Sequence, residues 1–341
     1  MRTTMQYSTL GRSGIKVSKM GLGTMNFGVG AGLGTVDETD ARRIIDSFLD
    51  AGHNLIDTAN AYNGGQAEEF VGRAVADRRS SAVIATKAHL PQGSGPNDSG
   101  LSRAHLTRAL EGSLRRLGTD YIDIYQANLW DGSTPLEETM ATFDGFVKSG
   151  KVRHIGCANF TAAQLVRSQW VAEQVGGTRY VSCQAQYSLL NRDIEADIIA
   201  TAGEQGIGVL TYAALGGGVL AGRYQRGVPA DPDSRIGKLL AIPAPSAHRW
   251  ANELLNDHNL DIAEEVGKVA TDLGTTSAAV ALAWLAAKGG LASVITGPRT
   301  LEQHTQNAAG FDLELPADLL VRLDEVSGPA PHAITGIRHA V

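Results

Sequence analysis

Residues 121–130, YIDIYQANLW, have the pattern of a buried strand that ends in polar residues. Apolar side chains such as Ile122 and Ile124 suit a strand interior. Two amides, Gln126 and Asn128, follow at its carboxyl end. They either cap the strand by bonding to nearby backbone, or Asn128 faces a binding site. The rest of the chain has to decide between these two interpretations.

Seven other apolar runs resemble this one, and amphipathic helical stretches separate them. The predicted strands are 18–24, 53–59, 82–87, 121–127, 153–159, 180–186, 207–212 and 292–297. The predicted helices are 39–51, 66–76, 102–117, 135–149, 161–174, 194–204, 260–273 and 277–288, most of them followed by glycine. Before them, MQYSTL and IKVSKM flank Gly11 to Gly14, which predicts an N-terminal hairpin.

Eight strands that alternate with helices predict a (β/α)8 TIM barrel with an N-terminal β-hairpin cap. The competing fold, a doubly wound open sheet, usually carries GxGxxG after a strand, and that motif follows none of the strands here. We expect one barrel domain over residues 1–341. Residues 223–250, rich in Pro, Gly and charge, are predicted to form a long βα loop of the kind that often acts as a lid. Residues 328–341 are predicted to form a C-terminal tail.

Composition restricts the partners and the location that we expect. The 341 residues carry a net charge of −6 without a basic cluster, so neither nucleic acid nor an anionic membrane is an expected partner. No apolar run approaches about 18 residues, and the first residues lack the apolar core of a signal peptide. Cys157 and Cys183 lie in apolar, strand-like runs, which suits buried thiols in a reducing cytoplasm. The nine histidines show no metal-binding spacing, so we expect no metal site.

Polar residues at the strand ends matter because barrels of this kind carry their chemistry there. A buried Lys87 needs a carboxylate partner, and Asp57 is the acid near a strand end that can serve. A protonated lysine close to a phenol favours the phenolate and lowers a tyrosine pKa from about 10. Taken singly, each residue is as typical of a strand cap or a core ion pair. Together, Asp57, Tyr62 and Lys87 predict a proton-donating set.

The stretch DTANAYNGG (57–65), followed by ATK (85–87), resembles the aldo-keto reductase superfamily. In that pattern a strand-end Asp, a Tyr five residues on and a Lys on the next strand form three members of a catalytic tetrad. The resemblance runs almost end to end through LGRSGIKVSKMGLGTMNFG (10–28), GKVRHIGCANF (150–160) and VITGPRTLEQHTQN (294–307). It implies a (β/α)8 barrel closed at its bottom by an N-terminal hairpin.

The fourth tetrad member in most of the superfamily is a histidine, and this chain has Asn128 at that position. In having an asparagine at this position, the chain resembles the potassium-channel β-subunit branch of the superfamily and the bacterial reductases similar to it. By this resemblance Asn128 faces the substrate carbonyl and can donate a hydrogen bond to its oxygen. It cannot exchange a proton as an imidazole can.

The resemblance also implies a nicotinamide cofactor. Asn159 and Gln184 match the family's residues whose amides hold the nicotinamide carboxamide. Tyr212 matches the aromatic residue that stacks on the nicotinamide ring. NADP(H) is preferred to NAD(H) because Arg299 matches a residue that pairs with the 2′-phosphate. Spaced by four, Arg299, Gln303 and Asn307 would share one helix face. The remaining implied cofactor-binding residues are Leu215, Gly217, Gly222, Arg235 and Gly297.

The resemblance implies a small-molecule substrate with a carbonyl group: an aldehyde, a ketone or a sugar. The loop residues Met25, Phe27 and Trp130 are its expected contacts. Two other functions stay open. One is a cofactor-binding regulatory or sensor subunit with slow turnover, suggested by Asn128. The other is a reductase of a keto sugar or a C=C bond.

Overall fold

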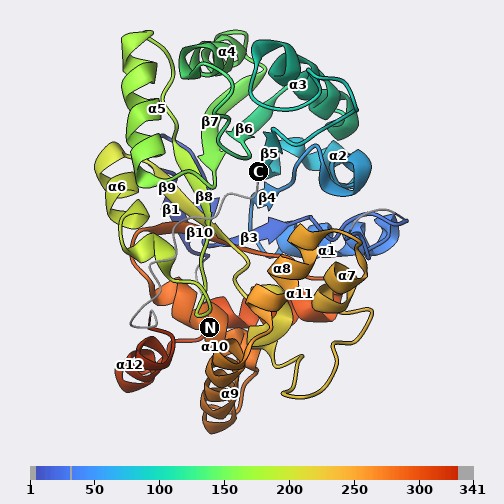
Figure 1. Cartoon of the computed structure of the whole chain (residues 1–341), viewed down its shortest axis with the longest axis vertical. Helices are drawn as coiled ribbons and strands as arrows, with labels where there is room; N and C mark the ends of the chain where they lie inside the picture. Colours follow the sequence, from blue (N-terminus) through green and yellow to red (C-terminus); the bar gives the residue numbers. More distant parts are fainter. Residues whose placement is uncertain (1–4, 31–32, 329–341) are drawn as a thin grey trace. The chain divides into compact units, whose positions relative to one another are not determined.

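The computed structural model describes residues 5–30 and 33–328, and its central feature is a closed barrel of eight parallel strands (Figure 1). The barrel strands follow each other in the order β10-β3-β4-β5-β6-β7-β8-β9. This confirms the predicted (β/α)8 barrel. The strands are β3 (Met20–Gly23), β4 (Leu55–Asp57), β5 (Val83–Ala88), β6 (Ile122–Ala127), β7 (Val152–Ala158), β8 (Ser182–Gln186), β9 (Gly208–Tyr212) and β10 (Leu291–Thr296).

Several helices between the strands begin and end at residues with recognisable capping chemistry. The hydroxyl of Ser102 accepts from the third backbone N–H of its helix, and Thr161 forms a full capping box with Gln164. Gly118 and Gly206 end their helices in the left-handed conformation, with φ of 61° and 69°. These helices are α1 (Glu38–Asp50), α2 (Gln66–Val75), α3 (Arg103–Leu117), α4 (Leu136–Lys148), α5 (Ala162–Gln174), α6 (Ile198–Gln205), α9 (Asp257–Asp272) and α10 (Ser277–Ala287).

The N-terminal hairpin is present as β1 (Tyr7–Thr9) and β2 (Lys16–Ser18), paired antiparallel. Leu10 and Val17 of this hairpin belong to one buried cluster with the barrel residues Leu55, Ala85 and Ile124. Burying each such aliphatic side chain stabilises the fold by about 1.5–3 kcal/mol. The hairpin therefore covers the apolar part of the barrel interior, as the sequence predicts.

Strand alternation then decides where the polar residues point. Side chains two residues apart on a strand share a face, so residues that follow the apolar cluster by two also face the interior. Leu55 is followed in this way by Asp57, and Ala85 by Lys87. The interior therefore changes from apolar to charged toward the carboxyl ends of β4 and β5.

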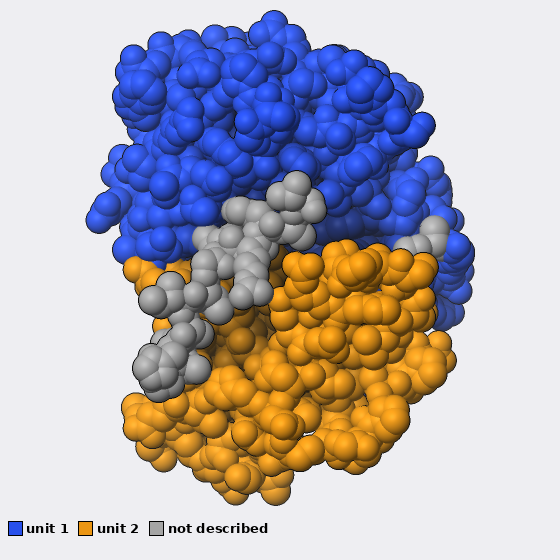
Figure 2. Space-filling model, viewed as in Figure 1, with its two compact units in different colours: residues 1–185, 197–210, 290–304 blue, residues 186–196, 211–289, 305–341 orange. Residues whose placement is uncertain are grey.

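The chain divides into two compact units, coloured separately in Figure 2. The first comprises residues 1–185, 197–210 and 290–304, and the second comprises residues 186–196, 211–289 and 305–341. The expectation of a single domain stays a prediction.

Three sequence expectations need correction. Residues 223–250 are not an irregular loop, because they contain α7 (Arg235–Ala241) and most of α8 (Pro245–Leu254). Their periodicity was hidden because each helix is short and closely flanked by Pro and Gly. The predicted helix at 194–204 begins later, since residues 193–195 form a separate 3-10 turn before α6. Helix α11 (Leu301–Asp312) starts after Arg299, and α12 (Ala317–Val326) was not predicted. Residues 329–341 of the tail lie outside the described residues.

Candidate active site

Strands β4 and β5 bring an aspartate and a lysine together inside the barrel. Lys87 Nζ donates to both carboxylate oxygens of Asp57 at 2.7 Å and to the carbonyl oxygen of Thr58 at 2.8 Å. Only 1% of the lysine side chain and 4% of the aspartate side chain is exposed. A buried charge needs a partner of this kind, because solvent cannot stabilise it. The structure thus contains the expected ion pair, and its catalytic role stays a prediction.

The ion pair sets the charge state of the lysine. Burial by itself would lower the Lys87 pKa, but the Asp57 carboxylate and the Tyr62 phenol outweigh burial, and the pKa is raised above its ordinary value. Lys87 is therefore an ammonium throughout the neutral pH range. Its Nζ lies 5.3 Å from the centroid of the Tyr62 ring. A positive charge thus stands next to the phenol that the sequence singles out.

A strained turn presents Tyr62 to this ammonium. Tyr62 opens the 3-10 turn η1 (Tyr62–Gly65), the next element after β4, in which Asn63 adopts a left-handed φ of 51°. The buried Asn63 amide donates to the carbonyl oxygens of Met25 and Phe27 at 2.9 and 2.7 Å. These two bonds hold the turn against the segment after β3, and they offset the unfavourable backbone conformation.

Gln184 of β8 reaches the same ion pair. Its Nε2 donates to Asp57 Oδ1 at 2.7 Å, and the residue is 3% exposed. The resemblance implies that this amide holds the cofactor carboxamide, and no sequence pattern indicates its bond to the aspartate. The two are chemically compatible, because an amide that donates through nitrogen still has an oxygen to accept with.

The strand end at Asn128 is fixed through its backbone, and the expectation that its side chain faces a binding site stays a prediction. Its backbone N–H donates to the Ala88 carbonyl oxygen at 3.0 Å, and its own carbonyl oxygen accepts from Asn159 Nδ2 at 3.0 Å. Asn159 has a left-handed φ of 59° and donates its N–H to the Gln184 carbonyl oxygen. Backbone bonds therefore join these strand ends. The Asn128 side-chain amide makes no hydrogen bond to any residue that the structure describes.

Of the expected residues after β10, Gly297, Arg299 and Gln303 lie in the first unit. The Gly297 carbonyl oxygen accepts from Asn26 at 2.7 Å, and the Arg299 N–H donates to Gln303 Oε1 at 2.9 Å. Because α11 begins at Leu301, Arg299 precedes the helix, so the shared helix face with Gln303 and Asn307 is wrong for Arg299. Asn307 is a buried residue of α11 in the second unit.

Within the second unit, the glycine-rich stretch forms a tight left-handed turn. Gly217 and Gly218 have φ of 65° and 102°, and Gly222 has φ of 71°. A Cβ placed on Gly217 would lie 3.4 Å from Cγ of Arg235, so the arginine stem packs against the turn. The Tyr224 hydroxyl donates to the Gly217 carbonyl oxygen at 3.0 Å. Leu215 immediately precedes the turn, and Tyr212 ends β9.

The three expected substrate contacts differ in accessibility. Phe27 is fully buried, whereas Met25 and Trp130 are half-buried. The Trp130 ring packs edge-on against Phe160, with centroids 5.2 Å apart. Only Met25 and Trp130 therefore expose part of their surface.

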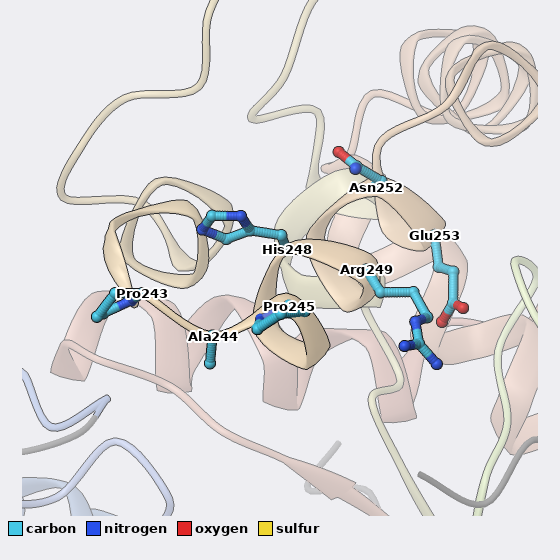
Figure 3. A pocket seen from close by; sticks show the side chains of 7 residues that line it. All are labelled: Pro243, Ala244, Pro245, His248, Arg249, Asn252 and Glu253. Carbon is cyan, nitrogen blue, oxygen red and sulfur yellow. The ribbon is translucent and has the colours of Figure 1, made fainter.

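A separate open hollow lies on α8 (Figure 3). Pro243, Ala244, Pro245, His248, Arg249, Asn252 and Glu253 line it. None of these residues belongs to the predicted site, and no buried charge faces the hollow. We therefore place the candidate site at the strand ends that carry the ion pair.

Sequence reasoning missed Glu68 and Thr86. Glu68 is a fully buried acid of α2, and Thr86 donates to its Oε1 at 2.6 Å. An acid in the first turn of a helix is usually solvated, so its burial was not foreseen. The signal available was its position between apolar Ala67 and Phe70.

Comparison with known proteins identifies the family of this chain. The model of the aldo/keto reductase family matches residues 19–327. YrpG of Bacillus subtilis (strain 168), described as an uncharacterized oxidoreductase, is 38% identical over 96% of this chain and 99% of its own length. A probable voltage-gated potassium channel subunit beta of Oryza sativa subsp. japonica is 34% identical over 91% of this chain and 92% of its own. An aldo-keto reductase of Fusarium vanettenii is 31% identical over 97% of this chain and 93% of its own.

The chain therefore belongs to the aldo/keto reductase family, whose members generally use NAD(P)H. The family and the named relatives support a general oxidoreductase role for this chain. Among the described residues, no group of three or more His, Cys, Asp or Glu could hold a metal ion. No single helix of residues 5–30 and 33–328 is long and apolar enough to cross a membrane, and α9 and α10 reach that composition only together, across a 98° bend.

Proposed function

We propose that this protein is an NADP(H)-dependent reductase of carbonyl groups in which Tyr62 donates the proton. The observation that carries the proposal is the buried Asp57–Lys87 ion pair beside the Tyr62 phenol. A carbonyl that accepts a hydride also needs a proton on its oxygen, and a positioned acid next to a cation can supply one. Aldehydes, ketones and sugars are the proposed substrate class.

Three residues have distinct proposed parts in moving that proton: Tyr62, Lys87 and Asp57. Tyr62 holds the proton on its hydroxyl oxygen and releases it as charge develops on the substrate oxygen. Lys87 stabilises the resulting phenolate, because an ammonium next to an anion favours the charged form. Asp57 holds Lys87 in place and keeps it protonated. In the direction of alcohol oxidation, the same groups act in reverse.

Asn128 is proposed to orient the substrate carbonyl. Its backbone is fixed by bonds to Ala88 and Asn159, so the strand end is held in place. Its side-chain amide can donate one hydrogen bond to a carbonyl oxygen, but it cannot exchange a proton. Proton transfer therefore falls to Tyr62 alone.

The residues present fit a nicotinamide dinucleotide. The left-handed glycines Gly217 and Gly218 carry no side chain, so the backbone of this turn can approach a pyrophosphate closely. Arg235, packed against that turn, brings a guanidinium stem to the same place. When bound, the cofactor would supply the hydride. Asn159 and Gln184 are the proposed partners of its carboxamide, Tyr212 of its ring, and Leu215 and Gly222 of the wrapping loop.

The preference for NADP(H) over NAD(H) depends on Arg299. A guanidinium binds a phosphate through two parallel hydrogen bonds, so an arginine near the ribose favours the 2′-phosphate. Gln303 fixes the backbone of Arg299 by accepting its N–H. Gly297, Gln303 and Asn307 are the other residues that we propose for this end of the cofactor.

The test is NADPH oxidation with a panel of aldehydes, ketones and keto sugars, comparing wild type with Tyr62→Phe. Cofactor binding is followed in both by quenching of tryptophan fluorescence. We expect turnover in wild type, its collapse in Tyr62→Phe, and equal binding in the two proteins. Tight binding without turnover on any carbonyl would refute the proposal.

A second candidate is a cofactor-binding regulatory or sensor subunit with slow turnover. It is favoured by Asn128 and by the 34% identity to a protein named as a probable channel subunit beta. Stoichiometric recovery of a membrane protein in a pull-down with the intact chain would support this candidate.

The reduction of a keto sugar or a C=C bond is a further alternative. Product analysis by mass and NMR separates reduction of C=O from reduction of C=C. The proposed location is the cytoplasm, since Cys157 and Cys183 are buried free thiols.

A further inference from the structure

A second buried charge lies outside the barrel, behind β5. Glu68 of α2 has a fully buried side chain, and its two oxygens have different partners. Oε1 accepts from the Thr86 hydroxyl at 2.6 Å, and Oε2 accepts from Arg116 Nε at 2.7 Å. A buried carboxylate costs free energy unless both oxygens are hydrogen-bonded, and here both are.

The network of Glu68, Thr86 and Arg116 includes a residue of β5, the strand that carries Lys87. Thr86 and Lys87 are consecutive in β5, so their side chains leave opposite faces of the strand. Lys87 points into the barrel, where Asp57 holds it, and Thr86 points outward, where Glu68 holds it. The end of β5 is thus fixed from both faces at neighbouring residues.

The same network also holds the turn that carries Tyr62. Glu68 stands in the first turn of α2, directly after η1, which ends at Gly65 with a left-handed φ of 93°. A Cβ on Gly65 would lie 2.6 Å from Cδ of Arg116, so the arginine lies flat on the end of the turn. Figure 1 shows α2 and α3, the helices that carry Glu68 and Arg116, beside each other and next to β5.

We propose that Glu68 is a positioning residue: its carboxylate joins the turn of Tyr62 to the strand of Lys87 and so fixes the phenol against the ammonium. The inference rests on the proposed function, because it assigns a partner to the proton donor named there. Glu68 touches neither substrate nor cofactor in this assignment. It acts only through the backbone of η1 and β5.

Loss of the carboxylate should loosen the phenol from the ammonium. Glu68→Leu leaves the buried Thr86 hydroxyl and the partly exposed Arg116 guanidinium without this acceptor. A displacement of about 1 Å at a catalytic group costs roughly 10²-fold in rate. Glu68→Gln keeps an acceptor oxygen and a similar shape, so it should retain a rate within about tenfold of wild type.

The experiment compares Glu68→Leu and Glu68→Gln with a matched control, Asp123→Leu. Asp123 lies near the start of β6, where it accepts from Arg79 and from the Ile84 N–H at 2.7 and 2.9 Å. Its loss also removes a largely buried ion pair, but far along the strand from the carboxyl end. We measure kcat, KM, the pH dependence of kcat and the unfolding temperature of each variant.

A second readout needs neither cofactor nor turnover. Tyrosine labelled with ¹³C at Cζ reports the titration of Tyr62 by NMR, with Tyr62→Phe identifying its signal. In Glu68→Leu we expect kcat to fall about 100-fold, KM for the cofactor to stay unchanged, and the Tyr62 titration to move to higher pH. Glu68→Gln should keep kcat within about tenfold of wild type and leave the Tyr62 titration near its wild-type position. Asp123→Leu should lower only the unfolding temperature.

Wild-type kcat and an unchanged Tyr62 titration in Glu68→Leu, with a stability loss like that of Asp123→Leu, would overturn the proposal. If Glu68→Leu does not fold, Thr86→Val decides, because it removes one hydroxyl and keeps the shape. It should shift the same titration in the same direction, and an unshifted titration refutes the proposal. If wild type shows no turnover, the proposed function fails, while the titration still tests the positioning role.

Discussion

Removing one member of the Asp57–Lys87 pair should cost far more stability than removing both. Because 1% of the lysine side chain and 4% of the aspartate side chain is exposed, solvent cannot screen the charge that remains. Breaking a buried pair from one side typically costs about 3–5 kcal/mol. Replacing both members by apolar residues of similar volume is often neutral or stabilising by about 1–4 kcal/mol.

The assay is a double-mutant cycle of Asp57→Leu, Lys87→Met and the double variant, with urea unfolding at pH 7. We expect each single variant to lose about 3–5 kcal/mol and the double variant to lose much less than their sum. The double variant should still lose some stability, because it also removes the hydrogen bond from Gln184 to the aspartate. Additive losses, with no coupling energy between the two sites, would refute the reasoning that the pair is a single buried unit.

Three further predictions follow from the same site. Because the Lys87 pKa is raised, the stability that this group contributes is fully present below its unfolded pKa of about 10.4 and is lost as pH rises through the folded pKa. Urea unfolding from pH 7 to 12 checks this, and a loss confined to acid pH would contradict it. Asn128→His should keep or raise kcat on simple aldehydes, whereas Asn128→Leu should lower it by roughly 10²-fold as a lost hydrogen-bond donor does; unchanged turnover in Asn128→Leu would show that no orienting bond exists. Arg299→Ala should raise the Kd for NADPH by at least about tenfold and leave that for NADH nearly unchanged, and equal effects on both cofactors in a fluorescence titration would exclude a 2′-phosphate contact.

The barrel could be predicted because its determinants are local. Parallel strands buried on both faces appear as short apolar runs, and several helices carry their own caps, such as Ser102 and Gly118 of α3. The ion pair could be predicted because a lysine at the end of a buried strand requires an acid nearby. Polar residues at the other strand ends gave further candidates, including Asn128, and the resemblance to the family gave the loop residues such as Arg235.

The parts that sequence missed depend on tertiary contacts. Glu68 looks like a solvated helix-start acid, and only packing against Thr86 and Arg116 shows that it is buried. The bond from Gln184 to Asp57 joins residues 127 positions apart, so no local pattern indicates it. The short helices α7 and α8 were masked by Pro and Gly, whose effect on a helix depends on whether they fall at its ends.

The central claim is that Tyr62 donates the proton while the chain holds a reduced nicotinamide. A single-turnover experiment tests it most directly: enzyme loaded with NADPH is mixed with an aldehyde, and the loss of NADPH absorbance is followed in wild type and in Tyr62→Phe. We predict a rapid decay in wild type and a decay at least about 100-fold slower in Tyr62→Phe at equal NADPH occupancy. Equal decay rates in the two proteins would contradict the account.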